Sequence, residues 1–197
     1  MCARYYIADV DTEPDLQQFI DAVRRKSNCA ELKVSGEVYP GNTAPVIANN
    51  RKMLRDAFAM KWGFHSPSGN LIINARSETS AYKPMFRDSM LQRRCIIPAS
   101  WYFEWEHKGA DKIRYAIRSC TANIMYLAGL YRFEYVFPVF TVLTRSPADN
   151  IKFIHDRMPV ILPKDMINDW LNPKYKADDL MKYADLSVSY INSPETV

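Results

Sequence analysis

The sequence predicts an α+β fold with a mainly antiparallel, barrel-like β-sheet and flanking helices. Two observations support this prediction: most apolar runs have the alternation or β-rich composition of strands, and helical patterns do not alternate with them regularly. Regular alternation would favour parallel βαβ winding instead. With 197 residues, 48% of them hydrophobic and 24% charged, the chain can build one sizeable core, and we expect a single domain over residues 1–197.

The clearest helix is predicted over residues 12–26, TEPDLQQFIDAVRRK. Its apolar residues recur at helical spacing and form one stripe, and Thr12 can cap the first turn. The basic residues at its end complement the negative pole of the helix dipole. The stripe consists of Leu16, Phe19, Ile20 and Val23. Shorter helices are predicted over residues 81–91, 163–171 and 177–184.

Strands are predicted wherever apolar residues alternate or cluster between turn residues. In residues 53–64 an alternating set is expected to share one face of a strand. This set consists of Leu54, Phe58, Met60 and Trp62. Prolines and glycines in YPGNTAP, HSPSGN and HKGAD separate the apolar runs, as turns do. An extended segment is expected over residues 71–79, and further strands over residues 94–105, 114–119, 124–133, 137–144 and 186–191.

Charge and cysteine content restrict the class of protein. The net charge of +4 permits an anionic partner without requiring one. None of the four cysteines forms a C-x-x-C pair, which argues against a zinc knuckle or a thioredoxin motif. We expect no metal and no cofactor. Acidic residues near the start argue against a signal peptide, and the longest apolar run is far short of the ~20 residues that span a bilayer. We therefore expect a soluble, reduced, cytoplasmic protein, nucleoid-associated if it comes from a bacterium, with no membrane partner.

Cys2 is the first candidate for chemistry. If the start methionine is removed, Cys2 carries an α-amine and a thiol on adjacent carbons, with ordinary pKa values near ~8 and ~8.5. Such a group condenses with an aldehyde to an imine, and the thiol then closes a thiazolidine ring. An N-terminal cysteine can also act as an amidohydrolase nucleophile with its own amine as base. The alternative is an incidental residue at a loose terminus, and the residue alone leaves all three open.

Glu104 stands in the aromatic stretch SWYFEWEH. In a strand it shares a face with Tyr102, while Trp101, Phe103 and Trp105 face the other side. A carboxylate walled by aromatics tends to have a raised pKa, which suits proton transfer near neutral pH. The alternative is an edge strand whose glutamate faces water.

Two further segments carry polar candidates. His155 lies in an apolar stretch, IHDRMP, and is either a hydrogen-bonded core residue or a member of a proton-transfer set with a thiol and a carboxylate. In LIINARSET, Asn74, Arg76 and Glu78 are expected on one side of an extended segment. They either face solvent, or the asparagine holds a carbonyl and the arginine a phosphate. Arg4 is placed to bind a second phosphate.

These stretches together resemble a known family. MCARYY, NARSET, CIIPASWYFEW and IHDRMPVIL occur in the order seen in the SOS response-associated peptidase (SRAP) family, and they span most of the chain. The resemblance implies one α+β domain with a basic cleft for single-stranded DNA. It further implies covalent capture of abasic sites, in which an N-terminal cysteine forms a thiazolidine crosslink with the ring-opened deoxyribose.

The resemblance also implies roles for individual residues. Cys2 matches the nucleophile, Asn74 the asparagine lining the crosslink site, Glu104 the glutamate assisting proton transfer, and His155 the histidine aiding crosslink formation and reversal. The expected DNA-binding residues are Arg4, Arg76, Trp105 and Arg157. The expected partner is abasic single-stranded DNA, bound by a monomer.

Two departures from the family pattern stand out. Glu37 replaces an asparagine that family members often carry before a V-A-P segment, so the resemblance leaves that cleft contact open. HSPSGN stands where many members have a tryptophan-rich wedge, which leaves a preference for DNA junctions open. Two other functions remain as alternatives: a cysteine-dependent (auto)peptidase, and a non-catalytic binder of single-stranded nucleic acid.

Overall fold

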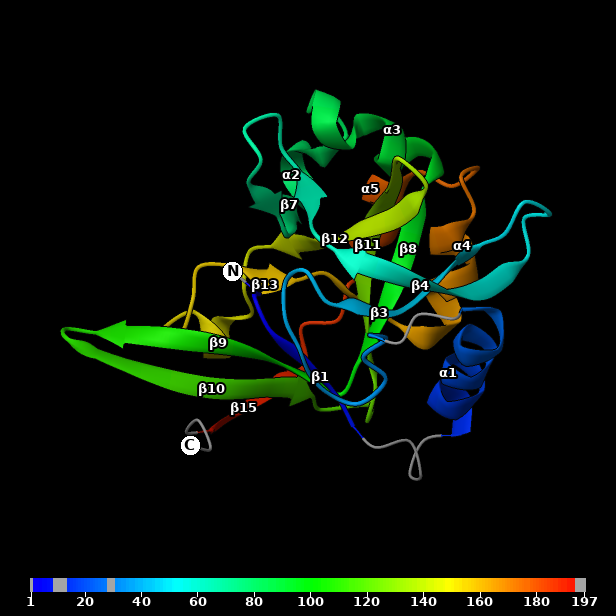
Figure 1. Ribbon diagram of the computed structural model, residues 1–197. Coiled ribbons are helices and arrows are strands. Elements are labelled where there is room, and N and C mark those ends of the chain that lie inside the picture. The colour runs from blue at the N-terminus through cyan, green and yellow to red at the C-terminus, as the bar shows by residue number, and fades with distance from the viewer. Residues whose placement is uncertain (1, 9–13, 28–30, 194–197) are drawn as a thin grey trace.

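The computed structural model describes residues 2–8, 14–27 and 31–193, and its strands form two main sheets (Figure 1). The five-stranded sheet has the order β15-β10-β9-β1-β2. Its strands are β1 (Tyr5–Ile7), β2 (Gly36–Val38), β9 (Trp101–Lys108), β10 (Asp111–Ser119) and β15 (Val188–Asn192). The eight-stranded sheet consists of β3 (Thr43–Asn49), β4 (Arg55–Trp62), β7 (Asn74–Arg76), β8 (Arg94–Ala99), β11 (Met125–Glu134), β12 (Phe137–Arg145), β13 (Met158–Pro159) and β14 (Ile161–Leu162). A separate pair joins β5 (Phe64–His65) to β6 (Leu71–Ile72).

Strands of the eight-stranded sheet close into a barrel. The path β12-β4-β3-β8-β11 returns to β12 because β11 and β12 also pair with each other. Among the strands that the structure describes, the pairings are antiparallel except those of β12 with β4 and with β7. Gly129 lies in the barrel wall, where an added Cβ would come within 2.8 Å of the Thr141 carbonyl oxygen. The predicted α+β fold with a mainly antiparallel, barrel-like sheet is confirmed.

Short helices cover the outside of the barrel. The helices are α1 (Pro14–Lys26), α2 (Ser77–Ser80), α3 (Pro84–Gln92), α4 (Ile167–Leu171) and α5 (Ala177–Met181), with 3-10 turns η2 (Asp149–Ile151) and η3 (Lys164–Met166). Helix α1 packs against β3 and β4, and Leu16, Ile20 and Val23 of its predicted stripe are buried. The predicted cap Thr12 lies outside the described residues. Helix α3 begins later than predicted because Pro84 takes the first helical position.

Three local predictions are wrong. The run over residues 94–105 is not one strand: it breaks at Ser100, whose Oγ accepts a hydrogen bond from the Ala8 amide at 2.9 Å. The break moves the chain from the barrel into the five-stranded sheet. Leu54 is 61% exposed because it closes a turn with Asn50 before β4 begins. Glu78 does not share an extended face with Asn74, since α2 starts at Ser77.

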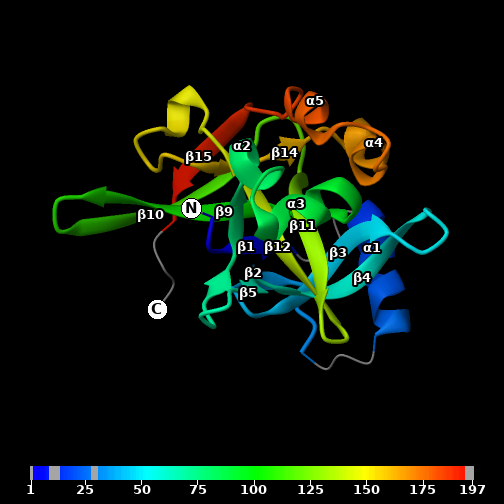
Figure 2. The ribbon, with the colours of Figure 1, turned by 90° about the horizontal axis from the view of Figure 1, so that it is seen from above.

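Two strand pairings between distant parts of the sequence position the predicted site residues. β1 pairs with β9, with Tyr5 opposite Tyr102, and β7 pairs in parallel with β12, with Asn74 opposite Val142. β9 and β10 extend away from the barrel as a long hairpin in both views (Figures 1 and 2). The sequence HSPSGN forms the tight connection between β5 and β6, with Gly69 at a φ of +84°.

Candidate active site

Cys2 lies fully buried just ahead of β1. Its backbone carbonyl accepts a 2.8 Å hydrogen bond from Nδ2 of Asn74, the first residue of β7. The thiol sulfur lies 3.9 Å from the carbonyl oxygen of Arg4. The parallel pairing of β7 with β12 fixes the asparagine in place. The amide therefore holds the backbone of Cys2 against the barrel.

The other end of the Asn74 amide is an unused acceptor. Its Oδ1 atom is buried and has no hydrogen-bond partner among the described residues. Leaving a buried acceptor unsatisfied costs about 1–3 kcal/mol, so such a group indicates a site where a donor binds. A donor on Cys2 or on a bound substrate would satisfy it.

Glu104 faces the interior from β9. The strand alternation predicted for this stretch is confirmed, because Tyr102 and Glu104 are buried while Trp105 is partly exposed. Burial raises the pKa of Glu104 to about 7, and the nearby Asp156 carboxylate acts in the same direction. The alternative in which Glu104 faces water is therefore wrong. At neutral pH this carboxyl group can both give and take a proton.

The Cys2 thiol and the Glu104 carboxylate are electrostatically coupled. Burial raises the pKa of the thiol well above its usual value, and the charge of Glu104 raises it further. The thiol is therefore protonated at neutral pH. Its proton must move to a base when the sulfur attacks an electrophile, and the carboxylate whose charge raises the thiol pKa is the candidate for that base.

His155 sits at the edge of the same region, after η2. Its Nδ1 atom accepts a hydrogen bond from the Arg157 amide at 3.0 Å and also lies 2.7 Å from Oδ1 of Asp156. One nitrogen cannot accept from the amide and donate to the carboxylate at once. Burial lowers the pKa of His155, which favours the neutral ring with Nδ1 as acceptor and the proton on Nε2.

Arg4 occupies the centre of a charged aromatic cluster outside the buried site. Its guanidinium lies 4.5 Å from the ring centre of Tyr39 and 5.0 Å from that of Trp105. It also pairs with Glu37 at 3.3 Å. The residue that departs from the family pattern, Glu37, thus holds Arg4. Glu37 also binds the guanidinium of Arg114, and it accepts a 2.8 Å hydrogen bond from the Tyr39 hydroxyl.

Two cations of this cluster were missed by sequence reasoning. Lys112 lies 5.2 Å from the ring centre of Trp105, and Arg114 lies 3.7 Å from that of Phe103. Both come from β10, opposite β9. The alternation of RYAIRS contained the signal for Arg114, because every second residue of a strand faces the same side. Only the pairing with β9 shows what that face meets.

The two remaining predicted DNA contacts, Arg76 and Arg157, differ in exposure and in their bonds to other residues. Arg76 ends β7 with an exposed side chain. Arg157 is 12% exposed and binds both carboxylate oxygens of Glu78 at 2.8 Å, together with the Thr144 carbonyl. The arginine fork thus links α2 to β12. A DNA contact by Arg157 stays a prediction, and its first role in the fold is to anchor Glu78.

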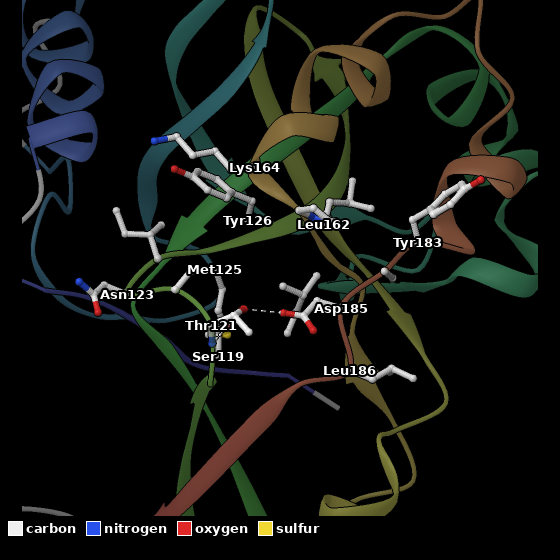
Figure 3. Close-up of a pocket in the computed structure, with 15 residues that line it drawn as sticks. Ser119, Thr121, Asn123, Met125, Tyr126, Leu162, Lys164, Tyr183, Asp185 and Leu186 are labelled. Atoms are coloured by element: carbon white, nitrogen blue, oxygen red, sulfur yellow. Dashed lines mark hydrogen bonds between the residues drawn. The ribbon is translucent and has the colours of Figure 1, made fainter.

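Among the described residues, no group of three His, Cys, Asp or Glu side chains could hold a metal ion, and no helix is long and apolar enough to cross a membrane. A cavity of about 660 Å³ opens between β11, β14 and the segment around Asp185 (Figure 3). None of Cys2, Asn74, Glu104 or His155 lines this cavity.

The closed barrel and the second antiparallel sheet describe an α+β protein, in which a buried Cys2 thiol is electrostatically coupled to the buried carboxyl group of Glu104. The chain belongs to the SRAP family: the model described as "SOS response associated peptidase (SRAP)" matches residues 1–192. The resemblance found in the sequence is confirmed.

Several named relatives are similar to this chain, two of those described here over almost its whole length. "Abasic site processing protein YoaM" of Bacillus subtilis is 33% identical over 99% of this chain and 94% of its own length. "Abasic site processing protein YoqW" of Bacillus phage SPbeta is 32% identical over 99% of this chain and 96% of its own. "Abasic site processing protein YedK" of Escherichia coli is 27% identical over 57% of this chain.

Solved structures show the same fold. A crystal structure of a protein from Bacteroides thetaiotaomicron covers 98% of this chain and 93% of its own, with a TM-score of 0.77 and 22% identity. A second, from Bordetella bronchiseptica, covers 98% of this chain and 100% of its own, with a TM-score of 0.76 and 23% identity.

Proposed function

We propose that this chain processes abasic sites in single-stranded DNA by capturing them covalently through Cys2. The observation that carries the proposal is that two residues act on Cys2. Asn74 donates a 2.8 Å hydrogen bond to the backbone carbonyl of Cys2, and Glu104, whose pKa is about 7, is electrostatically coupled to the Cys2 thiol. Relatives named as abasic site processing proteins support this substrate. The proposal requires Cys2 to be the first residue of the mature chain.

The chemistry uses the aldehyde that an abasic deoxyribose presents when its ring opens. The α-amine of Cys2 attacks this carbonyl carbon, forming a C–N bond, and the resulting carbinolamine loses water to give an imine. The thiol sulfur then attacks the imine carbon, and its proton ends on the nitrogen. One aldehyde and one aminothiol thereby give a thiazolidine and one water.

The site residues supply the proton transfers and the positioning. Protonated Glu104 donates to the sugar oxygen as the ring opens, and it regains a proton from the C1′ hydroxyl as that group becomes the aldehyde. It then donates to the hydroxyl group that leaves the carbinolamine, and its carboxylate takes the thiol proton. Neutral His155 can exchange protons through Nε2. The unused Oδ1 of Asn74 accepts a hydrogen bond from the amine or a sugar hydroxyl.

Incubation of the purified protein with an abasic oligonucleotide tests the proposal. The unmodified protein should give a covalent, heat-stable band in a denaturing gel, and Cys2→Ala should give none. Intact mass should show the loss of Met1 and, after capture, the mass of the open sugar adduct minus one water. A band of equal intensity from Cys2→Ala, or no band from protein that starts at Cys2, would disprove covalent capture.

A cysteine-dependent peptidase remains the second candidate because the family description contains the word peptidase. The same thiol, carboxyl and imidazole groups suit acyl transfer. Cleavage of a peptide panel that disappears with Cys2→Ala, without any DNA crosslink, would favour it. Salt-sensitive DNA binding that survives Cys2→Ser without a covalent product would instead favour a non-catalytic binder.

A further inference from the structure

The outer face of the five-stranded sheet carries a row of aromatic and basic side chains that the proposed chemistry does not use. The strand register places Tyr6 opposite Trp101, and Arg118 follows Ile117, the last β10 residue paired with β9. Trp101 and Arg118 line the same cavities. Arg4 and Phe103 are linked by a 2.9 Å backbone hydrogen bond. Because alternate residues share a face, these side chains lie on the side of the sheet opposite Glu104.

The aromatic part of this row is a preformed stack. The rings of Tyr6 and Trp101 lie 4.2 Å apart between centroids with an interplanar angle of 7°. Both side chains are half-buried, so part of their surface faces solvent. The neighbouring Phe103 is buried beneath the guanidinium of Arg114. The face therefore offers one open aromatic stack and one cation held flat on a ring.

Two cavities make this face a continuous groove. One of about 420 Å³ is lined by Glu37 and Arg114 at one end and by Trp101 and Arg118 at the other. A second of about 650 Å³ is also lined by Trp101 and Arg118 and continues toward Cys120. Glu37 and Arg114 belong to the cluster around Arg4, so the groove begins beside the proposed site.

The charged lining of the groove is mostly positive. Its cations are Arg114 and Arg118, and Arg4 and Lys112 lie beside it, against the ring of Trp105. Glu37, at the end of the groove, pairs with Arg4 and Arg114. The Arg118 side chain is exposed, and no hydrogen bond or ion pair joins it to any described residue. An exposed cation beside an open aromatic stack is the arrangement that binds the backbone and bases of single-stranded nucleic acid.

We propose that this groove binds the single strand that flanks the captured residue, with Trp101 and Tyr6 stacking on bases and Arg118 contacting phosphate. The inference rests on the proposed function, since it extends the strand held at Arg4. Trp101 lies four positions before Trp105 on β9, a path of about 14 Å at roughly 3.4 Å per residue. That length accommodates several nucleotides beyond the lesion.

A negatively charged side chain lies beyond the far end of the groove. The second cavity shares Ser119 and Thr121 with the 660 Å³ cavity of Figure 3. There the Thr121 hydroxyl donates to the carboxylate of Asp185 at 3.2 Å, and this carboxylate also accepts from the Ser187 amide. A carboxylate held in this way repels phosphate, so the bound strand is expected to stop near Cys120.

Binding of two oligonucleotides of different length tests the inference. Both carry a reduced abasic residue, which has no aldehyde. The shorter strand has about two nucleotides on each side of this residue and the longer strand about ten, lengths chosen from the site sizes of proteins that bind single strands. The unmodified protein should bind the longer strand more tightly. Arg118→Glu should weaken binding of the longer strand about tenfold and change the shorter one less than twofold. Arg51→Glu, an equal charge change in the exposed β3–β4 turn, should change neither.

A second variant guards against a purely electrostatic effect. Trp101→Leu should remove most of the advantage of the longer strand while thermal unfolding shows an intact fold. Equal affinity of the unmodified protein for both lengths, or equal weakening of both by Arg118→Glu, would overturn the inference. So would a concentration-dependent dimer that Arg118→Glu dissolves, because the groove would then bind a second copy.

The two proposals fail in different ways. If covalent capture is wrong, an aldehyde-bearing abasic strand gives no Cys2-dependent band, yet the length preference and its loss in Arg118→Glu remain. If only the groove is wrong, the short strand still crosslinks and Arg118→Glu leaves the length preference unchanged.

Discussion

The buried site and the outer groove handle charge in opposite ways. Around Cys2, burial raises the pKa of both the thiol and Glu104, so the groups are held near their neutral forms. On the groove, the Arg118 side chain is exposed, and Glu37 lies between Arg114 and Arg4, which lower its pKa against the effect of burial. Neutral groups with shifted pKa values suit proton transfer, whereas surface cations suit attraction of a polyanion.

This difference predicts that substitutions in the buried site change the rate of covalent capture, whereas substitutions on the groove change the affinity for DNA. A substitution in the buried site should slow covalent capture and leave non-covalent DNA binding nearly unchanged. A substitution on the groove, or at the exposed Arg76 at the end of β7, which we call the rim of the site, should change DNA affinity and its salt dependence. It should leave the rate at saturating DNA unchanged. A variant of either region that changed both quantities equally would break the comparison.

Glu104→Gln is expected to have the largest effect. Loss of the proton donor and acceptor should slow capture about 100-fold, the lower range for general acid–base catalysis. Since the pKa of Glu104 is about 7, the unmodified rate should contain a limb that falls as the pH rises through about 7, and the variant should lack it. Glu106→Gln, two residues further on the same strand face, is the control and should retain the limb. A slowed variant that keeps the limb would assign the titration to another group.

The same substitution should stabilise the protein at high pH. The folded pKa of about 7 lies above the ordinary value of 4.5, so between these values the folded state holds a proton that the unfolded state has lost. The resulting stability is complete below about pH 4.5 and is lost as the pH rises through about 7, by up to about 3 kcal/mol. Urea unfolding at pH 5 and pH 8 measures this change. Glu104→Gln should reduce the difference between the two values, and an unchanged difference would contradict it.

Asn74→Ala is expected to have a smaller effect on rate. It removes the hydrogen bond to the Cys2 carbonyl, so capture should slow about tenfold through lost positioning, with a loss of about 1 kcal/mol in stability. Single-turnover crosslinking measures the rate. Asn70→Ala, in the exposed turn after β5, is the matched control. A change in DNA affinity rather than rate would place Asn74 with the rim.

Local patterns in the sequence were enough to orient the catalytic candidates. Strand alternation placed Glu104 with Tyr102 and away from Trp105, because side-chain direction repeats every two residues and needs no knowledge of partners. The apolar stripe of α1 was also predicted from a local repeat, in this case the helical one. The break at Ser100 was not, since β-rich residues continue on both sides and only the tertiary hydrogen bond to Ala8 marks the turn.

Non-local pairings decided the rest. The pairing of Glu37 with Arg114 joins residues 77 positions apart, and that of Asn74 with Cys2 joins residues 72 apart. No local pattern specifies such contacts, because they depend on strand order in the folded sheet. The sequence therefore indicated that Glu37 departs from the family pattern, but not which cations it binds.

Arg76→Ala tests the rim. Its side chain is exposed at the end of β7, so a lost phosphate contact should weaken DNA binding about fivefold and reduce the salt slope of the affinity by about 1, without changing the saturated capture rate. Anisotropy titrations at several salt concentrations measure both quantities. Arg51→Ala should change neither. A fall in the saturated rate would indicate that Arg76 also orients the aldehyde.

Glu37→Gln is expected to have the smallest effect, and its sign distinguishes two roles for this carboxylate. If Glu37 competes with phosphate for Arg4 and Arg114, its neutralisation should strengthen DNA binding about threefold and increase the salt slope by about 1. If Glu37 instead positions Arg4 over Trp105, the same change should weaken binding without increasing the slope. The capture rate at saturating DNA should stay constant in both cases, because Glu37 lies on the outer face with Arg114 and not with Glu104. A changed rate would show that charges on the groove reach the buried site, and the two regions would then act as one.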